Sequence, residues 1–241
     1  SSLACLAGIS HAEGTIETTS AGTFNFSANV ALTSDYVWRG VSQSDEKGAI
    51  QGGFDVNHST GLYAGIWGSN VDFNEGSSGA GDPSMELDLY GGFAHEFSNG
   101  VGVDIGLINY RYPGDDDLNW VEYYGGLSYT VMGLGLSGSI NYSDDVFGSD
   151  ETGTYYTAGA EYGIDTKYPI TLSGSFGYYS FDDDVFGNDA PDSYKDWKLG
   201  AAVAVGNFTF DLSYVDTDND GEDLFGSWAD DRFVATLSAA F

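Results

Sequence analysis

Apolar and polar positions alternate along most of the chain, and the last ten residues show the pattern most clearly. Phe233, Leu237 and Phe241 fall on one parity, whereas Arg232 and Thr236 fall on the other. A period of two residues is typical of a β-strand with one apolar and one polar face. The C-terminal segment is therefore predicted to be a strand that runs to the last residue.

The same alternation recurs in about twelve segments separated by polar breaks, with boundaries good to a few residues. The segments span residues 23–38, 48–57, 62–73, 84–97, 101–112, 118–130, 134–142, 154–164, 170–181, 194–205, 208–215 and 232–241. Lengths of about 8 to 16 residues bracket the 9 to 11 that a tilted strand needs to cross a bilayer. The pattern predicts an all-β fold, a transmembrane antiparallel up-and-down β-barrel, because an even number of such strands can close into a ring.

The connections between these segments alternate between short and long. Short connections are predicted at 58–61, 98–100, 131–133, 165–169 and 206–207, and long acidic ones at 74–83, 143–153, 182–193 and 216–231. In outer-membrane barrels the turns on the periplasmic side are short and the loops on the outside are long. We therefore expect short periplasmic turns and long acidic extracellular loops.

One internal repeat falls in the long connections. Residues 144–150 (Asp-Asp-Val-Phe-Gly-Ser-Asp) match residues 183–189 (Asp-Asp-Val-Phe-Gly-Asn-Asp), and residues 222–227 are a weaker copy, so the copies begin 39 residues apart. Duplication of a hairpin with a turn-forming glycine explains the repeat without a function. The alternative is a ring of acidic, aromatic-tipped loops that hold cations or contact a partner.

Charge narrows the choice of partners. The chain has 241 residues with 37 Asp and Glu against 7 Lys and Arg, a net charge of -30. Nucleic acid and anionic membrane surfaces both need a positive patch, so neither is an expected partner. The 35 glycines and the 37 aromatic residues (17 Tyr, 15 Phe, 5 Trp) suit short strands and tight turns.

Three regions are expected along the chain. Residues 1–12 resemble the end of a signal peptide, with a short apolar stretch and a small-x-small cleavage site at 10–12. Cys5 lies in this remnant and would be removed with it. Residues 13–22 are predicted to form a periplasmic linker, and residues 23–241 the barrel.

Parity assigns a set of charged residues to the lumen, because a base on the lipid face near the bilayer centre costs about 2 to 4 kcal/mol. The predicted lining residues are Asp35, Arg39, Asp55, Glu86, Asp88, Asp104, Glu122, Glu161, Asp196, Lys198, Asp211 and Arg232. An acidic lumen favours cations over anions. The rival interpretation is a barrel plugged by the same side chains in ion-pair networks around the three bases.

Aromatic residues on the other parity predict two girdles at the membrane interfaces. The residues placed outward are Tyr36, Trp38, Tyr63, Trp67, Tyr123, Tyr142, Tyr156, Tyr162, Phe208 and Tyr214. The alternative role for such rings, as stacking platforms for sugars, would require them to face inward.

The acidic stretch 216–221 matches the first half of a calcium loop, with Asp216, Asp218 and Asp220 as alternate oxygen ligands. Ser227 stands where a bidentate glutamate is needed, which excludes a full EF-hand. Weak Ca²⁺ binding is one hypothesis and a solvated acidic loop is the other; no other cofactor is expected.

The chain is not expected to be an enzyme. Its three histidines, His11, His58 and His95, all fall away from the long-loop side, so none can activate a serine there. No cluster of histidine and acidic residues has metal-ligand spacing.

Residues 33–44 (Thr-Ser-Asp-Tyr-Val-Trp-Arg-Gly-Val-Ser-Gln-Ser) resemble the opening motif of the TorF-type porins, a bacterial family of conserved hypothetical outer-membrane proteins. Residues 51–55 (Gln-Gly-Gly-Phe-Asp), 61–65 (Gly-Leu-Tyr-Ala-Gly) and 86–92 (Glu-Leu-Asp-Leu-Tyr-Gly-Gly) continue the similarity. Phe241 resembles the C-terminal signal that such barrels present for membrane assembly. The resemblance implies an outer-membrane barrel of porin type, and it implies no particular solute.

These observations predict a narrow passive diffusion channel in the outer membrane of a Gram-negative bacterium. Its acidic lumen would prefer cations or small cationic and neutral solutes. Its other partners would be outer-membrane lipid and the barrel assembly machinery. The alternatives are a plugged surface barrel with a structural, adhesive or cation-binding role for its acidic loops, and a soluble acidic β protein.

Overall fold

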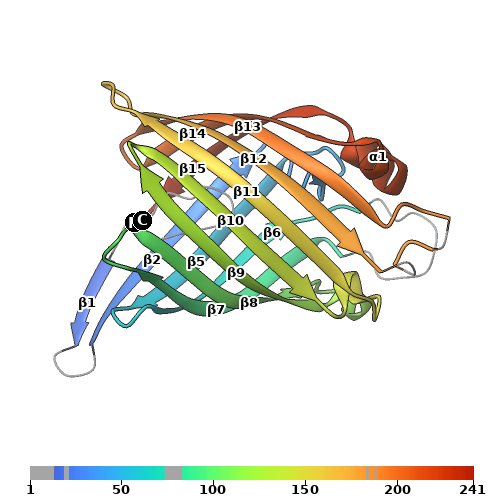
Figure 1. Cartoon of the computed structure of the whole chain (residues 1–241), viewed down its shortest axis with the longest axis horizontal. Helices are drawn as coiled ribbons and strands as arrows, with labels where there is room; N and C mark the ends of the chain where they lie inside the picture. Colours follow the sequence, from blue (N-terminus) through green and yellow to red (C-terminus); the bar gives the residue numbers. More distant parts are fainter. Residues whose placement is uncertain (1–13, 19–21, 74–82, 183–184, 188) are drawn as a thin grey trace.

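The computed structural model describes residues 14–18, 22–73, 83–182, 185–187 and 189–241. In this part of the chain, twelve antiparallel strands form a closed barrel (Figure 1). They are β2 (Gly22–Thr33), β5 (Ala49–His58), β6 (Leu62–Asn70), β7 (Met85–Glu96), β8 (Val101–Arg111), β9 (Trp120–Val131), β10 (Leu134–Ser143), β11 (Gly153–Ile164), β12 (Ile170–Phe181), β13 (Ser193–Val205), β14 (Phe208–Thr217) and β15 (Arg232–Ala240). The predicted signal remnant, with Cys5, lies outside the described residues.

Closure of the barrel depends on β2, which pairs with β5 on one side and with β15 on the other. Beyond the end of β15, the backbone N–H of Phe241 donates to the Ala28 carbonyl at 2.8 Å, and the Ala28 N–H donates to the Phe241 carbonyl at 2.9 Å. The last residue therefore completes the ring of twelve strands, so that each of these strands is paired on both sides.

The barrel presents its apolar parity outward, as the alternation predicts. Leu32, Ile50, Leu127, Leu199 and Phe233 are each more than half exposed, with fractions of 54, 64, 59, 63 and 70%. Large apolar side chains exposed on every side of a closed barrel suit a hydrocarbon environment.

Two predicted boundaries need correction. The first segment ends at Thr33 and not at Trp38, because Ser34 and Asp35 turn the chain into the barrel. The expected linker contains a short strand, β1 (Gly14–Thr18), which pairs with the start of β2 below the end of β15. β1 extends from the short-turn end of the barrel (Figure 1).

The long connections contain short helices. The longest is α1 (Asn219–Phe225), followed directly by the 3-10 turn η3 (Gly226–Ala229); two further 3-10 turns are η1 (Asp116–Leu118) and η2 (Val146–Gly148). Among the described residues, no helix is long and apolar enough to cross a membrane.

The connection 34–48 forms a small hairpin, in which β3 (Val37–Trp38) pairs with β4 (Val41–Ser42). Its two turn residues both have positive φ, 49° at Arg39 and 83° at Gly40. This is the pattern of a two-residue hairpin turn, which favours glycine and is unusual for arginine. A Cβ on Gly40 would lie 2.8 Å from Asp196 Cβ, so the tip of the hairpin is docked against β13.

Candidate functional site: the constriction of the lumen

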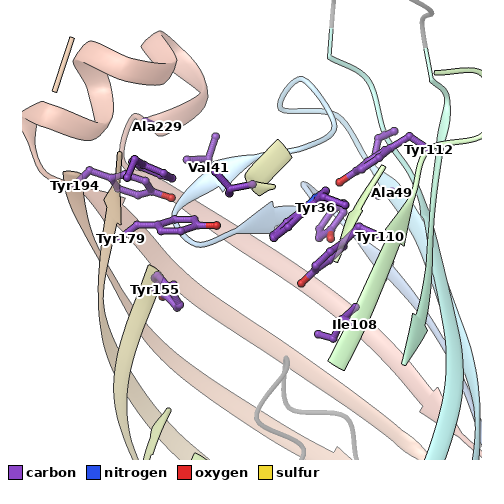
Figure 2. Packing of buried hydrophobic residues seen from close by; sticks show 14 residues of the cluster. Tyr36, Val41, Ala49, Ile108, Tyr110, Tyr112, Tyr155, Tyr179, Tyr194 and Ala229 are labelled. Carbon is purple, nitrogen blue, oxygen red and sulfur yellow. The ribbon is translucent and has the colours of Figure 1, made fainter. Parts of the chain in front are cut away.

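The hairpin 34–48 lies across the lumen at the long-loop end of the barrel. Figure 2 shows Tyr36 and Val41 of the hairpin between Tyr179 and Tyr194 on one side and Tyr110 on the other. All five side chains are buried, with exposed fractions between 1 and 8%. The hairpin therefore narrows this end of the lumen by packing against opposite walls. We call this layer the constriction.

Arg39 holds the tip of the hairpin in place. Its Nη2 donates to both carboxylate oxygens of Glu122, at 2.8 and 2.7 Å. Its guanidinium carbon lies 4.1 Å from the ring centres of Trp38 and Tyr155, and 4.7 Å from that of Tyr179. Both partners of the ion pair are almost fully buried, with 5 and 1% of their side chains exposed. The rings and the carboxylate together hold the desolvated Arg39 cation strongly.

The opposite side of the constriction is acidic. Glu86 accepts hydrogen bonds from the hydroxyl groups of Tyr36 and Tyr112, each at 2.6 Å. Burial, followed by the nearby Glu86 charge, raises the pKa of the Tyr36 phenol well above its ordinary value, so it stays a donor. Within the described residues, Asp88 Oδ1 is buried without a hydrogen-bond partner. Carboxylates therefore outnumber bases in this layer.

A second set of contacts anchors the base of the hairpin. Asp35 accepts hydrogen bonds from Ser42 at 2.7 Å and Ser44 at 2.8 Å, which closes the hairpin on itself. Its other oxygen pairs with Arg232 of β15 at 2.9 Å. Arg232 in turn donates to the Ser227 carbonyl at 2.6 Å. The hairpin is thus connected to the last loop and the last strand.

The phenylalanines of the three repeats meet above the hairpin. The ring centre of Phe186 lies 6.3 Å from that of Phe147 and 5.4 Å from that of Phe225. Phe147 also contacts Trp38, with 6.1 Å between the centres. Val146, beside Phe147, is fully buried. The described parts of the three repeats therefore pack against one another and against the hairpin, and we call them the lid. The hypothesis of acidic loops with free aromatic tips expected these rings to be exposed.

Below the constriction, a group of inward tyrosines continues the wall of the lumen, and two of them, Tyr90 and Tyr124, pack against the buried cluster above. Tyr63, Tyr90 and Tyr124 point into the barrel and are half-buried. Tyr63 donates to Asp104 at 2.6 Å and Tyr90 donates to Asp55. We call these five residues the lower lumen.

The remaining predicted lining residues are distributed around the same lumen. Asp196 accepts from the Tyr155 hydroxyl at 3.0 Å, beside Arg39. Asp211 accepts from Ser213 at 2.6 Å on β14. Glu161 and Lys198 have inward parity on β11 and β13, and neither is fully buried. The structure brings Arg39, Glu122 and Asp196 together. Asp211, Glu161 and Lys198 lie apart from them.

Four aromatic residues expected to face outward face inward instead: Tyr36, Trp38, Tyr63 and Trp67. Trp67 packs against Tyr36 at 5.4 Å, edge to face. The strand 62–70 is apolar on both parities, so its alternation does not identify the lipid face. Of the others, Tyr123, Tyr142, Tyr156, Tyr162 and Phe208 are exposed, as predicted.

The predicted calcium ligands serve other purposes. Asp218 caps α1 by accepting from the Gly221 N–H at 3.3 Å, and it pairs with Lys195 at 2.9 Å. Asp216 accepts from Tyr214 at 3.1 Å. In the described ranges, no three acidic or histidine side chains are grouped to hold a metal ion. Asp218 thus marks the start of α1, and weak Ca²⁺ binding by this stretch stays a prediction.

The sequence did not identify most of the aromatic residues that surround Arg39 and the hairpin. Tyr110, Trp120, Tyr155, Tyr179 and Tyr194 all lie on the inward parity within a few residues of the long-loop end of their strands. Inward parity and position together form a signal that could have identified them. Arg39 was itself predicted to line the lumen, but its contacts with Tyr155 and Tyr179 could not be predicted, because Arg39 comes from the connection 34–48.

Comparison with known structures supports the barrel assignment. The NanC porin is 12% identical with a TM-score of 0.59, over 89% of this chain and 98% of that one. The KdgM porin, also solved in complex with disordered oligogalacturonate, is 8% identical with a TM-score of 0.59, over 89% and 99%. The COG4313 outer-membrane channel from Pseudomonas putida F1 is 13% identical with a TM-score of 0.52, over 93% and 96%. These similarities show the fold, a twelve-stranded barrel of outer-membrane porin type.

The sequence comparison is more specific about the family. No curated protein matches the sequence. The resemblance to TorF-type porins stays a prediction. Residues 17–241 match the family described as "Bacterial protein of unknown function (Gcw_chp)". The chain therefore belongs to the bacterial Gcw_chp family.

Proposed function

We propose that the protein is an outer-membrane channel whose acidic lumen favours cationic and neutral solutes, and that the hairpin 34–48 closes it at rest. The observation that carries the proposal is the charge of the lumen. Of the twelve predicted lining residues, nine are acids and three are bases. Two of the three bases, Arg39 and Arg232, are already paired with Glu122 and Asp35.

This excess charge determines which solutes enter easily. Inside a low-dielectric wall, unpaired carboxylates lower the energy of a cation and raise that of an anion. Oligogalacturonate, the ligand named for the KdgM porin, carries a carboxylate on each sugar and would be repelled here. The carboxylates neither attract nor repel a neutral solute. The preference is therefore expected to be cations first, neutral solutes next and anions last.

Ion selectivity in a planar bilayer tests the proposal directly. Purified protein would be recorded in a tenfold KCl gradient, and we expect a reversal potential of the sign set by K⁺ permeation. The variant Lys198→Ala removes the third predicted lumenal base, for which the described residues provide no ion pair, and should increase the cation preference. A reversal potential that favours Cl⁻ would overturn the proposal.

A second candidate function is a permanently closed surface barrel. The specific observation in its favour is the burial of Tyr36, Val41, Ser42 and Ser44, which gives the hairpin the packing of a core. The two functions differ in one measurement. Zero conductance both in the wild type and in a variant whose hairpin is released would favour the closed barrel.

A further inference from the structure

The lower lumen has an aromatic wall opposite a hydroxyl wall. Tyr63, Tyr90 and Tyr124 belong to β6, β7 and β9. In the closed ring, β12 lies six strands from β6, and β13 lies six strands from β7, so these strands are diametrically opposite. On β12 the inward positions include Ser173 and Ser175, which are partly exposed. A solute in this part of the lumen would contact rings on one side. On the other side it would contact these hydroxyl groups and Lys198 of β13, which pairs in register with Ser175.

The three rings lie along the wall and not across the lumen. Each tyrosine pairs in register with a glycine of the adjacent strand: Tyr63 with Gly92, Tyr90 with Gly65 and Tyr124 with Gly106. A Cβ added to Gly92 or Gly106 would lie 2.7 Å from the Cζ of its partner ring, and one added to Gly65 would lie 2.5 Å from Tyr90 Cε2. The glycines therefore make room for the rings, which rest on the backbone with one face towards the lumen.

Carboxylates lie at the edges of these rings. Asp104 accepts from Tyr63, whose hydroxyl also contacts that of Tyr124, and Asp55 accepts from Tyr90. These bonds fix the ring orientation. A carboxylate has about four lone-pair positions, so the half-buried Asp55 can accept further hydrogen bonds from a solute, whereas Asp104 is only 4% exposed and holds the ring of Tyr63.

This arrangement matches the chemistry of a carbohydrate. A pyranose has an apolar C–H face that packs on an aromatic ring, and hydroxyl groups at its edges that donate to carboxylates. An amino sugar adds an ammonium group, which both the carboxylates and the ring faces attract. A uronate adds a carboxylate, which Asp55 and Asp104 repel.

We propose that the lower lumen is a binding site for neutral and amino-sugar oligosaccharides. The proposal rests on the proposed function, because a sugar site inside the lumen serves a solute that passes through it. It adds the class of solute to the charge preference argued above, and it assigns the recognition to Tyr63, Tyr90 and Tyr124.

Calorimetry on the purified barrel in detergent micelles tests binding without requiring conductance. The probes are the hexamers of glucosamine, N-acetylglucosamine and galacturonate. We expect binding of the first two, with glucosamine tighter, and no binding of the galacturonate hexamer. Binding of none of the three, or equal binding of galacturonate, would overturn the proposal.

A matched pair of variants locates the site. Tyr124→Leu removes an inward ring and should weaken the binding of both hexamers roughly two- to tenfold, the effect of one lost aromatic contact. Tyr123→Leu changes the adjacent, outward residue of β9 and should leave binding unchanged. Heat-modifiable gel migration verifies that each variant forms a barrel. Equal effects of the two substitutions would place the sugar elsewhere, and Tyr124→Phe, which keeps the ring, should bind as the wild type does.

The bilayer recording separates the two proposals. Cation-selective conductance without sugar binding would leave the channel standing and remove the sugar site. Sugar binding with a Cl⁻-selective reversal potential would leave the sugar site standing and overturn the preference for cations.

Discussion

Replacing Glu122 by glutamine should release the hairpin 34–48 from the lumen. Glu122→Gln keeps the shape of the side chain and one acceptor oxygen but removes the charge that Arg39 contacts at 2.7 Å. Arg39 would then be a buried cation among aromatic rings, with no anion bonded to it. The twelve-stranded ladder does not depend on this contact, so the cost falls on the docking of residues 34–48.

The structure sets the size of the effect. Removing one partner of a buried ion pair costs about 3 to 5 kcal/mol, and the retained acceptor and cation–π contacts place this variant near 3 kcal/mol. Since about 1.4 kcal/mol is a factor of ten in an equilibrium constant, the population of the undocked hairpin should increase roughly a hundredfold.

Trypsin cleavage after Arg39 measures undocking, because the peptide bond is accessible only when the hairpin leaves the lumen. We expect cleavage at Arg39 to be about a hundred times faster in Glu122→Gln when cleavage is slower than redocking, and we expect a higher open probability in bilayers. The control is Lys47→Ala in the same connection, whose pair with Asp72 is exposed and screened by water, so its loss should change cleavage at Arg39 little. Equal protection of Arg39 in Glu122→Gln and wild type, or equal effects of the variant and its control, would refute the reasoning.

Three further predictions concern the contacts around the hairpin. Arg232→Ala breaks the pair with Asp35 and should reduce the docking free energy of the hairpin by roughly 1 to 3 kcal/mol, so that cleavage at Arg39 accelerates less than in Glu122→Gln. A larger effect than that of Glu122→Gln would make this pair the principal anchor. Phe186→Ala removes the middle ring of the lid and should lower the free energy of local opening of residues 144–152 by about 1 to 2 kcal/mol, measured as faster amide exchange. Unchanged exchange would contradict the packing of the lid. Asp218→Ala removes the N-cap of α1 and should cost about 1 kcal/mol, measured as faster amide exchange in the helix. Burial opposes ionisation of Asp218, but hydrogen bonds from Lys195 and the Gly221 N–H outweigh it and lower its pKa below 3.8, so in the wild type this stability should be full at neutral pH and lost as pH falls through the lowered pKa, whereas Asp218→Ala should show no such loss.

The barrel itself could be predicted from the sequence, because a barrel with an apolar outer face and a polar lumen imposes a period of two on its strands. The predicted segment 170–181 coincides with β12, and the segments 101–112 and 134–142 differ from β8 and β10 by one residue at one end. Phe241 was expected to complete the last strand, and its backbone pairs with Ala28. These are local properties, since each residue needs only its neighbours two positions away to reveal its face.

The sequence placed Arg39, Glu122 and Arg232 in the lumen and left ion pairing there as an alternative, but it could not predict which side chains pair in the constriction, because these contacts join distant residues. Arg39 meets Glu122 across 83 positions and Arg232 meets Asp35 across 197. The alternation places Glu122 and Arg232 inside the barrel, but it cannot tell that a two-residue turn at Arg39 and Gly40 lies within their reach. These residues come within contact distance only after β15 has paired with β2 and the barrel has closed.

The sequence by itself thus determined the barrel, its even ring of strands, its outward apolar face and the acidic character of its lumen. Only the tertiary structure decided that residues 34–48 fold inward, that Phe147, Phe186 and Phe225 form one lid, and that Tyr63 faces the lumen. The physical reason is the same in each case. A strand exposed to lipid must show its polarity residue by residue, whereas a loop or a strand apolar on both faces takes its direction from the neighbours that barrel closure brings to it.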